Sequence, residues 1–309
     1  KDHIVLGNAL VDMYAKCGML AKAKQVLKQL PIRVVASWNA LISVYSQHGQ
    51  GDEALKCFEW MQHEGLAPDE TTFVCLLRAC ASTGAINKGE KIHDDIVSRG
   101  LLQKNVVVGT ALVDMYAKCG ALAKAQQALE ELPIRDVVSW NALIGGYAQQ
   151  GRGHRVMDCF TRMRNEGLSP NAVTFLCVIS ACNYSGRLDD AQTYFENLTG
   201  AYGIFPNLEH HTCMVAAFGY AGHFDKALSV IRAMPCSHYP VVWLALLRAC
   251  REWGNVKLAI FAFDQTVQLD SSCAAAYVLM NSIFISVGMR EDAEKVRLQY
   301  AAVLRSGDK

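Results

Sequence analysis

The sequence predicts an all-α protein built from repeats, and three observations support this fold class. Residues 9–18 return letter for letter as residues 111–120, so the chain repeats with a period of 102 residues. Hydrophobic residues make up 51% of the chain and only 7 of 309 residues are proline, which favours packed helices. Leu10, Met13 and Cys17 place apolar side chains on one helix face. We therefore expect one elongated α-solenoid of helix–turn–helix repeats rather than two globular domains.

The period divides into repeats of 31, 35 and 36 residues. This division follows from aligning the segments that end in Pro-Asp or Pro-Asn with those that end in Pro-Ile-Arg. The predicted repeats are 4–34, 35–69, 70–105, 106–136, 137–171, 172–207 and 208–239. Two divergent repeats follow near 240–273 and 274–307, so we expect an array over 1–239 and a distinct helical part over 240–309.

Within each of the first seven repeats, two helices are expected on either side of a glycine turn. The turn glycines are Gly18, Gly49, Gly84, Gly120, Gly151, Gly186 and Gly222. Small residues recur in the second helices, where the two helices of a hairpin would cross closely: Ala23, Ala54, Ala125, Ala191 and Ala227. Gly65 and Gly167, each followed by proline three residues later, should end a second helix. Asp69, Asp136 and Asn171 can then cap the next first helix.

The net charge of +1 gives little general attraction to nucleic acid, so any RNA contact must be local. No apolar run approaches the ~20 residues of a membrane span, and no signal peptide opens the chain. We therefore expect a soluble protein without membrane contact, although Lys1 in place of Met suggests an excised piece. Cysteines at repeat-phased positions, such as Cys17 and Cys119 or Cys75 and Cys177, suggest small buried residues in a reducing compartment.

No arrangement of residues predicts catalysis, a metal or a cofactor. The pairs Cys75-x4-Cys80 and Cys177-x4-Cys182 lack a second pair at zinc-site spacing. The segment 235–238 vaguely resembles half of a zinc deaminase signature, but no histidine is followed two residues later by glutamate. His210 and His211 are expected in a helix-entry pattern, and Trp38 and Trp140 in the core. We therefore expect a chain that is not itself an enzyme.

Several phrases of the sequence carry a family resemblance: "ALVDMYAKCG", "VVSWNALIGGYAQQG", "LEHHTCMVAAFGYAG" and "VVWLALLRACREWGNV". They resemble a plant pentatricopeptide repeat protein of the PLS class, with the seven repeats in the order S, P, L, S, P, L, S. Segments 255–259, 268–270 and 276–280 are similar to the E1 and E2 motifs of organellar RNA-editing factors. The resemblance implies a right-handed superhelical solenoid that binds single-stranded RNA in a mitochondrion or chloroplast, one nucleotide per repeat.

In such proteins two residues per repeat choose the base, namely the fifth residue and the last. The pairs here are Asn8 with Val34, Asn39 with Asp69, Thr110 with Asp136, Asn141 with Asn171, and Thr212 with Tyr239. The resemblance implies uracil for Asn with Asp, guanine for Thr with Asp, and cytosine or uracil for Asn with Asn. The expected RNA core is therefore 5′-U-n-G-(C or U)-3′. Val34 and Tyr239 depart from the family pattern, so repeats 4–34 and 208–239 have no assigned base.

Other positions match the family's contacts with the rest of the nucleotide. The residues implied to sandwich each base are Val5, Ala36, Val107, Val138 and Val173, and those implied to contact phosphate are Lys16 and Lys118. The L repeats pair Val74 with Asn105 and Leu176 with Asn207, and their apolar first members should read a base poorly.

The leading hypothesis is the site-recognition part of a C-to-U editing factor, with a deaminase domain in the same protein or recruited from another. Accessory proteins of the editing complex are further possible partners. One alternative is an RNA processing, stability or splicing factor without an editing step. The other is a protein-binding scaffold like a tetratricopeptide array, but its repeats would hold near 34 residues, whereas these alternate.

Overall fold

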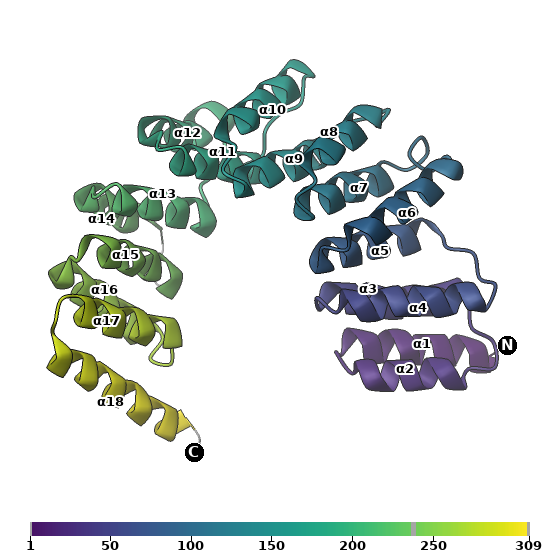
Figure 1. Ribbon diagram of the computed structural model, residues 1–309, viewed down its shortest axis with the longest axis horizontal. Coiled ribbons are helices and arrows are strands. Elements are labelled where there is room, and N and C mark those ends of the chain that lie inside the picture. Colours follow the sequence, from purple (N-terminus) through teal and green to yellow (C-terminus); the bar gives the residue numbers. More distant parts are fainter. Residues whose placement is uncertain (1, 236–238, 308–309) are drawn as a thin grey trace. The chain divides into compact units, whose positions relative to one another are not determined.

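The computed structural model describes the backbone of residues 2–235 and 239–307 and the side chains of residues 6–235 and 239–305. The described residues form α-helices joined by turns, with no strand among them (Figure 1). The helices are α1 (Asp2–Lys16), α2 (Leu20–Gln29), α3 (Val35–Gln47), α4 (Gly51–His63), α5 (Glu70–Thr83), α6 (Ile86–Ser98), α7 (Val106–Lys118), α8 (Leu122–Glu131), α9 (Val137–Gln149), α10 (Gly153–Asn165), α11 (Ala172–Tyr184), α12 (Leu188–Tyr202), α13 (Leu208–Tyr220), α14 (Phe224–Ala233), α15 (Pro240–Trp253), α16 (Val256–Leu269), α17 (Ala274–Ser286) and α18 (Arg290–Gly307). The predicted all-α class is confirmed.

The helices belong to two compact units. The first ends at Pro170 and contains α1 to α10; the second begins at Asn171 and contains α11 to α18. The boundary between the compact units, at 170/171, differs from the boundary at 239/240, where the predicted repeats give way to divergent ones. The array over 1–239 and the distinct part over 240–309 therefore remain a prediction about sequence motifs.

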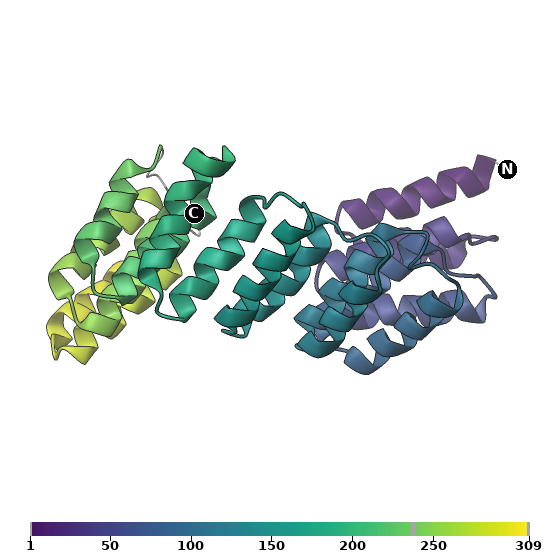
Figure 2. The same ribbon diagram turned by 90° about the horizontal axis from the view of Figure 1, so that it is seen from above.

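Within each compact unit, the odd-numbered helices pack on one another in chain order. In the first unit α1, α3, α5, α7 and α9 form this row, and α2, α4, α6 and α8 each pack on the following odd helix. In the second unit α11, α13, α15 and α17 form the row. Successive hairpins lie side by side within each unit (Figures 1 and 2). Each repeat therefore presents the start of its first helix next to that of its neighbour.

The turn and crossing residues take the conformations that the sequence predicts. All seven turn glycines have positive φ, between 67° at Gly84 and 79° at Gly120, a conformation that favours glycine. Gly65 and Gly167 also have positive φ and lie two residues beyond the ends of α4 and α10. The five predicted crossing alanines are completely buried. The largest fully buried side chains include Trp140, Phe73 and Phe175, so these rings belong to the packed core.

Across the described helices, none combines the length and apolar character needed to cross a lipid bilayer.

Candidate nucleic-acid interface

The last residue of each predicted repeat caps the first helix of the next repeat. Asp69, Asp136 and Asn171 accept hydrogen bonds from the backbone amides of Thr72, Ser139 and Thr174. In return, the backbone amide of each cap residue donates to the side-chain hydroxyl at this third helical position. Such a capping box satisfies two otherwise unpaired backbone donors and contributes about 1 kcal/mol. The predicted base-reading residues Asp69, Asp136 and Asn171 therefore also fix where a helix begins.

Asn39 and Asp69, the two predicted readers of repeat 35–69, are in direct contact. The Asn39 Nδ2 group donates a hydrogen bond of 2.8 Å to Asp69 Oδ1. The Asn39 Oδ1 atom accepts a hydrogen bond of 2.6 Å from the Thr72 hydroxyl. Asn39 is only 7% exposed, so these bonds hold its amide in one orientation at the junction of α3 and α5.

Asp69 is held in its charged form. Partial burial raises the pKa of its carboxyl, but the hydrogen bonds from the Thr72 amide and the Asn39 amide outweigh burial and leave the pKa lowered. Near neutral pH the Asp69 carboxylate therefore acts only as a hydrogen-bond acceptor.

The other fifth residues occupy different hydrogen-bonding environments. The Asn8 Oδ1 atom accepts a hydrogen bond from the Ser37 hydroxyl in the next repeat. The Thr212 hydroxyl donates to the Leu208 carbonyl of its own helix at 2.8 Å. The Thr110 hydroxyl oxygen is buried and has no hydrogen-bond partner among the described residues. Asn141 is 9% exposed in α9. In α3, α7, α9 and α13 the fifth position of the repeat thus lies one helical turn after the start of the helix.

Four of the residues expected to sandwich bases lie at the second position of their helices and face solvent. Val107, Val138 and Val173 are 63%, 57% and 52% exposed, and Ala36 is also exposed. The side chain of Val5 lies outside the described residues. Exposed branched apolar side chains at the same place in successive helices leave surface available for contact with a flat apolar group.

The two candidate phosphate contacts are paired with carboxylates. Lys16 Nζ lies 2.7 Å from Asp12 Oδ2, and Lys118 Nζ lies 2.8 Å from Asp114 Oδ2. Both lysine side chains are more than half exposed, and exposed ion pairs one helical turn apart are weak. The lysines can therefore exchange their carboxylate partners for another anion at little cost.

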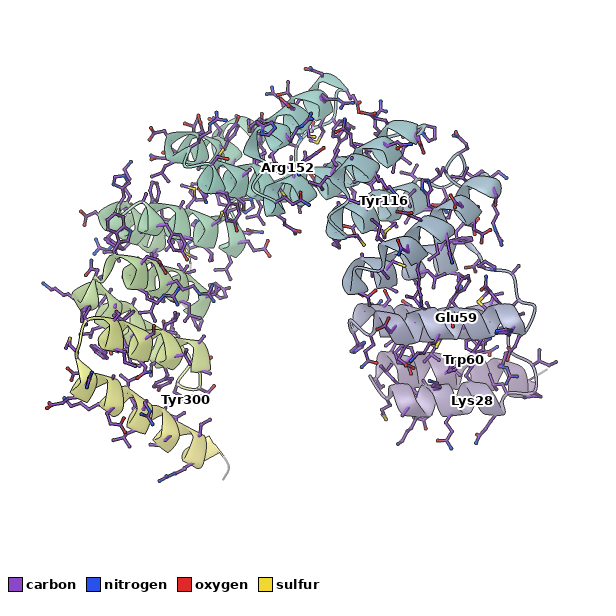
Figure 3. All side chains as sticks on the ribbon, viewed as in Figure 1. Lys28, Glu59, Trp60, Tyr116, Arg152 and Tyr300 are labelled. Carbon is purple, nitrogen blue, oxygen red and sulfur yellow. The ribbon has the colours of Figure 1, made fainter. Side chains whose placement is uncertain are left out.

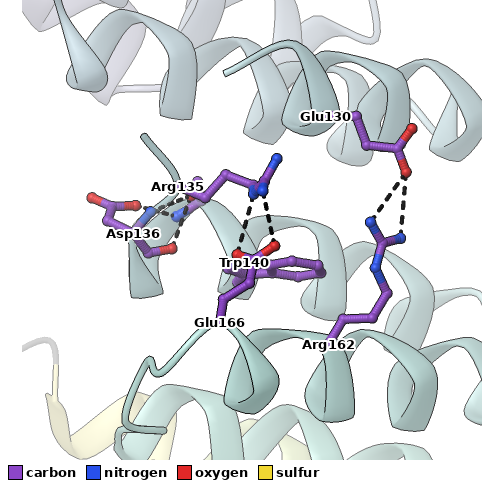
Figure 4. Close-up of polar contacts among 7 residues, drawn as sticks. Glu130, Arg135, Asp136, Trp140, Arg162 and Glu166 are labelled. Carbon is purple, nitrogen blue, oxygen red and sulfur yellow. Dashed lines mark hydrogen bonds and ion pairs between the residues drawn. The ribbon is translucent and has the colours of Figure 1, made fainter. Parts of the chain in front are cut away.

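The tryptophans predicted for the core are buried, and each contributes to a polar cluster that sequence reasoning missed. Glu166 Oε2 accepts hydrogen bonds from Trp140 Nε1 at 2.9 Å and Arg135 Nε at 3.1 Å (Figure 4). Trp140 itself is 0% exposed. Arg162 stacks on this tryptophan, with its guanidinium 5.4 Å from the ring centroid. Arg162 also reaches Glu130 at 3.3 Å, which joins α10 to α8.

The same cluster occurs one period earlier in the chain. Glu64 accepts from Trp38 Nε1 at 3.2 Å and pairs with Arg33 Nε at 2.7 Å. The sequence held a signal for these clusters, because Pro-Ile-Arg, Trp and Glu-Gly all recur after 102 residues. These clusters tie the start of a first helix to the end of the second helix in the same repeat.

A second aromatic and basic cluster lies on α2 and α4 of the first compact unit, among the second helices. Lys24 and Lys28 place their Nζ atoms 4.5 and 5.7 Å from the ring centroid of Trp60. Lys28 and Trp60 are labelled in Figure 3. None of the predicted base-reading, base-sandwiching or phosphate-contacting residues lies on these two helices.

The described cysteines are free thiols that differ in burial. Burial raises the pKa of Cys57 and Cys250 to about 12. Cys75, Cys80 and Cys182 are buried as expected, whereas Cys119 and Cys177 are half-buried. The described side chains contain no cluster of metal-ligating residues.

The prediction that Cys17 is buried was wrong. Cys119, at the equivalent position, contacts the Cys80 carbonyl of the preceding first helix at 3.5 Å. No described helix precedes α1 to cover Cys17 in the same way, so Cys17 is exposed.

His210 closes the capping box of α13 with Asn207, and its Nε2 lies 2.9 Å from the Ala172 carbonyl oxygen. His211 Nδ1 lies 2.9 Å from the Asn207 carbonyl oxygen. The predicted helix-entry role of both histidines is therefore confirmed. Burial lowers the pKa of His210, which keeps the imidazole neutral near pH 7.

Comparison with protein-family models identifies repeats over more than half of the chain. The model of the PPR repeat family matches residues 33–82 and 135–183, and the model of the PPR repeat matches residues 8–32, 71–101 and 209–238. Together these matches extend over more than half of the chain.

Curated relatives from Arabidopsis thaliana are similar over nearly the whole chain. The putative pentatricopeptide repeat-containing protein At1g68930 is 36% identical over 96% of this chain and 40% of its own length. The pentatricopeptide repeat-containing protein CRR2, named chloroplastic, is 37% identical over 96% of this chain and 45% of its own length. The chain thus spans less than half of either relative.

The fold is also similar to that of a solved repeat protein. The crystal structure of the pentatricopeptide repeat protein PPR10 in complex with an 18-nt psaJ RNA element superposes with a TM-score of 0.75. The match covers 97% of this chain and 45% of that chain, at 18% identity. The crystal structure of the pentatricopeptide repeat protein PPR10 from maize gives a TM-score of 0.57. These likenesses show the same helical repeat fold.

Proposed function

Because the chain belongs to the pentatricopeptide repeat family, we propose that it binds single-stranded RNA along the starts of its first helices, one nucleotide per repeat. The observation that carries this proposal is the hydrogen bond between Asn39 and Asp69. It joins the fifth and last residues of one repeat into a single polar site at a repeat junction. A base there can meet amide and carboxylate groups whose positions are already fixed, so little ordering is needed on binding.

The similarity to PPR10 in complex with an 18-nt psaJ RNA element supports a nucleic-acid partner. The exposed second-position residues Val107 and Val138 supply apolar surface between successive sites of the first compact unit. Apolar contact of this kind tolerates any base, so base choice falls to the polar pair in each repeat.

The proposed base order follows the chain. Repeat 35–69 reads uracil, repeat 106–136 reads guanine through Thr110 and Asp136, and repeat 137–171 reads cytosine or uracil through Asn141 and Asn171. The RNA core is then 5′-U-n-G-(C or U)-3′, with its 5′ end toward repeat 35–69.

We further propose that this RNA binding selects the site of organellar C-to-U editing, in a mitochondrion or chloroplast. The E-type helices of 240–309 would lie toward the 3′ side of the site, where a deaminase in the same protein or a partner would act. Purified chain should not deaminate cytidine, because no histidine of the sequence is followed two residues later by glutamate, as the catalytic half of a zinc deaminase signature requires.

Binding to a panel of short RNAs tests the base order. Each RNA carries one change at the U, G or pyrimidine position, and affinity is measured by fluorescence anisotropy at fixed salt. We expect the unchanged core to bind most tightly, with ~10-fold or more lost per wrong base, the loss typical of a polar site left unpaired. Equal affinity across the panel would contradict the proposal.

The substitution Thr110→Asn sharpens the test. It recreates in repeat 106–136 the pair formed by Asn39 and Asp69, so preference at that single position should change from guanine to uracil. Preference at the other positions should stay as in the parent chain.

A further inference from the structure

In two places, the third residue of a first helix contacts the fifth residue of the preceding repeat. In α5, the Thr72 hydroxyl donates a hydrogen bond of 2.6 Å to Asn39 Oδ1 of repeat 35–69. In α3, the Ser37 hydroxyl donates to Asn8 Oδ1 of repeat 4–34. Thr72 and Ser37 are 0% and 1% exposed, so neither side chain is open to a nucleotide. Each hydroxyl can therefore influence a nucleotide only through the asparagine that it contacts.

The capping box fixes the direction of the Thr72 hydroxyl. Its oxygen accepts a hydrogen bond of 3.2 Å from the Asp69 amide, so its single proton must point to another acceptor. Asp69 Oδ1 lies 2.9 Å away, but it already accepts from the Thr72 amide and from Asn39 Nδ2, each at 2.8 Å. Asn39 Oδ1 is closer and takes the proton. One hydroxyl thus both caps α5 and holds the Asn39 amide.

The orientation of the Asn39 amide decides which groups a base meets. A carboxamide has two N–H donors and two acceptor lone pairs. Asp69 takes one donor and Thr72 takes one acceptor site, so one N–H and one lone pair remain. Rotation of the amide by half a turn would exchange donor and acceptor. Uracil carries a carbonyl oxygen where cytosine carries an amino group, so discrimination between these two bases requires the amide to be held.

A hydroxyl residue stands at this third position after every repeat of the array whose fifth residue is asparagine. The pairs are Asn8 with Ser37, Asn39 with Thr72, and Asn141 with Thr174. Three of the other repeats have no hydroxyl there: Val74 with Val108, Leu176 with His210, and Thr212 with Val242. Hydroxyl residues therefore accompany the amides that need to be oriented.

The remaining repeat shows that a hydroxyl can cap a helix without holding the fifth residue. Thr110 is paired with Ser139, whose hydroxyl donates to the Asp136 carbonyl at 2.8 Å. The Thr110 hydroxyl oxygen has no hydrogen-bond partner in the part of the chain that the structure describes. Capping and orientation of the fifth residue can therefore be tested separately.

We propose that, where the fifth residue of a repeat is asparagine, the third residue of the next first helix is a positioning residue for base choice. In repeat 35–69, Thr72 holds the Asn39 amide so that Asn39 and Asp69 together discriminate uracil from cytosine. This inference rests on the proposed function, and it adds a buried third member to the two residues that read the base.

Thr72→Val tests this role, because valine keeps the shape of threonine and lacks the hydroxyl. Fluorescence anisotropy measures binding to RNAs that differ only at the U position and to RNAs that differ only at the G position. Asp69 alone would then hold the amide, so we expect the preference for uracil over cytosine to fall about fivefold, the effect of one neutral hydrogen bond. Preference at the G position should stay unchanged. Thr72→Ser keeps a hydroxyl and should bind like the parent.

Ser139→Ala is the matched control. Like Thr72, Ser139 accepts a hydrogen bond from the amide of its cap residue, at 3.0 Å from Asp136, but the fifth residue beside it is not an asparagine. Thermal unfolding should show similar losses of stability for Thr72→Val and Ser139→Ala, because each removes one hydrogen bond of a capping box. Only Thr72→Val should change base preference.

Thr174→Val gives an independent test in another hairpin, and it decides the question if circular dichroism shows that Thr72→Val does not fold. Thr174 closes a capping box with Asn171, and the fifth residue of that repeat is Asn141. We expect the preference for pyrimidine over purine at the last core position to fall, because a loosely held amide favours no base. The U and G positions should keep their preferences.

The outcomes separate this inference from the proposed function. If the threonine variants lose stability or overall affinity but keep the parent's preference at every position, the hydroxyls only cap helices and this inference is overturned alone. If the parent itself has no preference at the U and G positions, the proposed function fails as well.

Discussion

Arg135 and Glu166 stand 31 residues apart in the chain and form a two-pronged ion pair. Arg135 Nη2 lies 3.0 Å from Glu166 Oε1, and Arg135 Nε lies 3.1 Å from Glu166 Oε2. Both side chains are less than one-third exposed, and the same carboxylate accepts from the buried Trp140. We expect Glu166→Gln to lower the free energy of unfolding by about 1–2 kcal/mol, since it weakens charge-assisted bonds without changing the side-chain size. Chemical denaturation of both proteins measures the difference.

Glu59→Gln is the matched control for this substitution. Glu59 pairs with Lys88 at 3.7 Å, and its side chain is 58% exposed. An exposed single-contact pair contributes little, so the expected loss is below about 0.5 kcal/mol. Equal losses for Glu59→Gln and Glu166→Gln would show that the cluster around Trp140 adds nothing beyond surface charge.

Asp69→Asn should separate helix capping from base choice. Asparagine caps helices about as well as aspartate, so stability near pH 7 should change by less than about 1 kcal/mol. The loss of the carboxylate should move preference in repeat 35–69 from uracil toward the cytosine or uracil preference of the Asn141 and Asn171 pair. The RNA panel measures this change, and Asp69→Ala, which removes both functions, should lose stability and base preference together.

Stability should also depend on pH through Asp69. Its folded-state pKa is lowered, so its carboxylate contributes stability that is fully present above the unfolded pKa of about 4 and is lost as pH falls through the folded pKa. Denaturation of the parent and Asp69→Asn from about pH 7 to pH 2 measures this contribution. The difference between the two proteins should shrink only below about pH 4; a difference that is constant down to pH 2 would show that Asp69 is not specially stabilised as a carboxylate.

Lys118 should contribute to RNA affinity without affecting base choice. Lys118→Ala removes one candidate phosphate contact, so affinity should fall by a similar factor for every RNA in the panel. The slope of log affinity against log salt should decrease by about 0.7, the value expected for one contact to a single strand. Asp114→Asn should have the opposite effect on affinity, because it releases Lys118 from its 2.8 Å pair. A change in base preference with Lys118→Ala would contradict this role.

The sequence predicts local structure well because each signal acts over a few residues. Asp69, Asp136 and Asn171 cap helices as predicted, since a side chain needs only the amide three residues later. The pairing of Arg135 with Glu166 depends on how two helix ends meet, which no local pattern specifies. The 102-residue recurrence of arginine, tryptophan and glutamate was a signal that could have been used.

The candidate site also has features that the sequence predicts and features that depend on how the helices pack. Periodicity identifies the fifth and last residues of each repeat. The hydrogen bond between Asn39 and Asp69 also requires α3 and the start of α5 to pack at a particular distance. The hydrogen bond from Thr72 to Asn39 was not predicted for a similar reason, because it joins residues 33 apart in the chain.

The packing of hairpins against one another should be most sensitive where a helix begins against a neighbouring backbone. A Cβ atom added at Gly51, the first residue of α4, would lie 2.6 Å from the Ala79 carbonyl oxygen of α5. This backbone atom cannot move without shifting the whole helix, so Gly51→Ala should destabilise the protein by about 1–3 kcal/mol. Gly200 also lies in a helix, α12, but a Cβ there would meet no atom within 4 Å. Gly200→Ala should therefore stabilise the protein by about 0.5–1 kcal/mol, because alanine restricts the unfolded chain. Thermal unfolding measures both, and opposite signs for two identical substitutions are the expected result; a loss at both sites would show that helix contact does not set the effect.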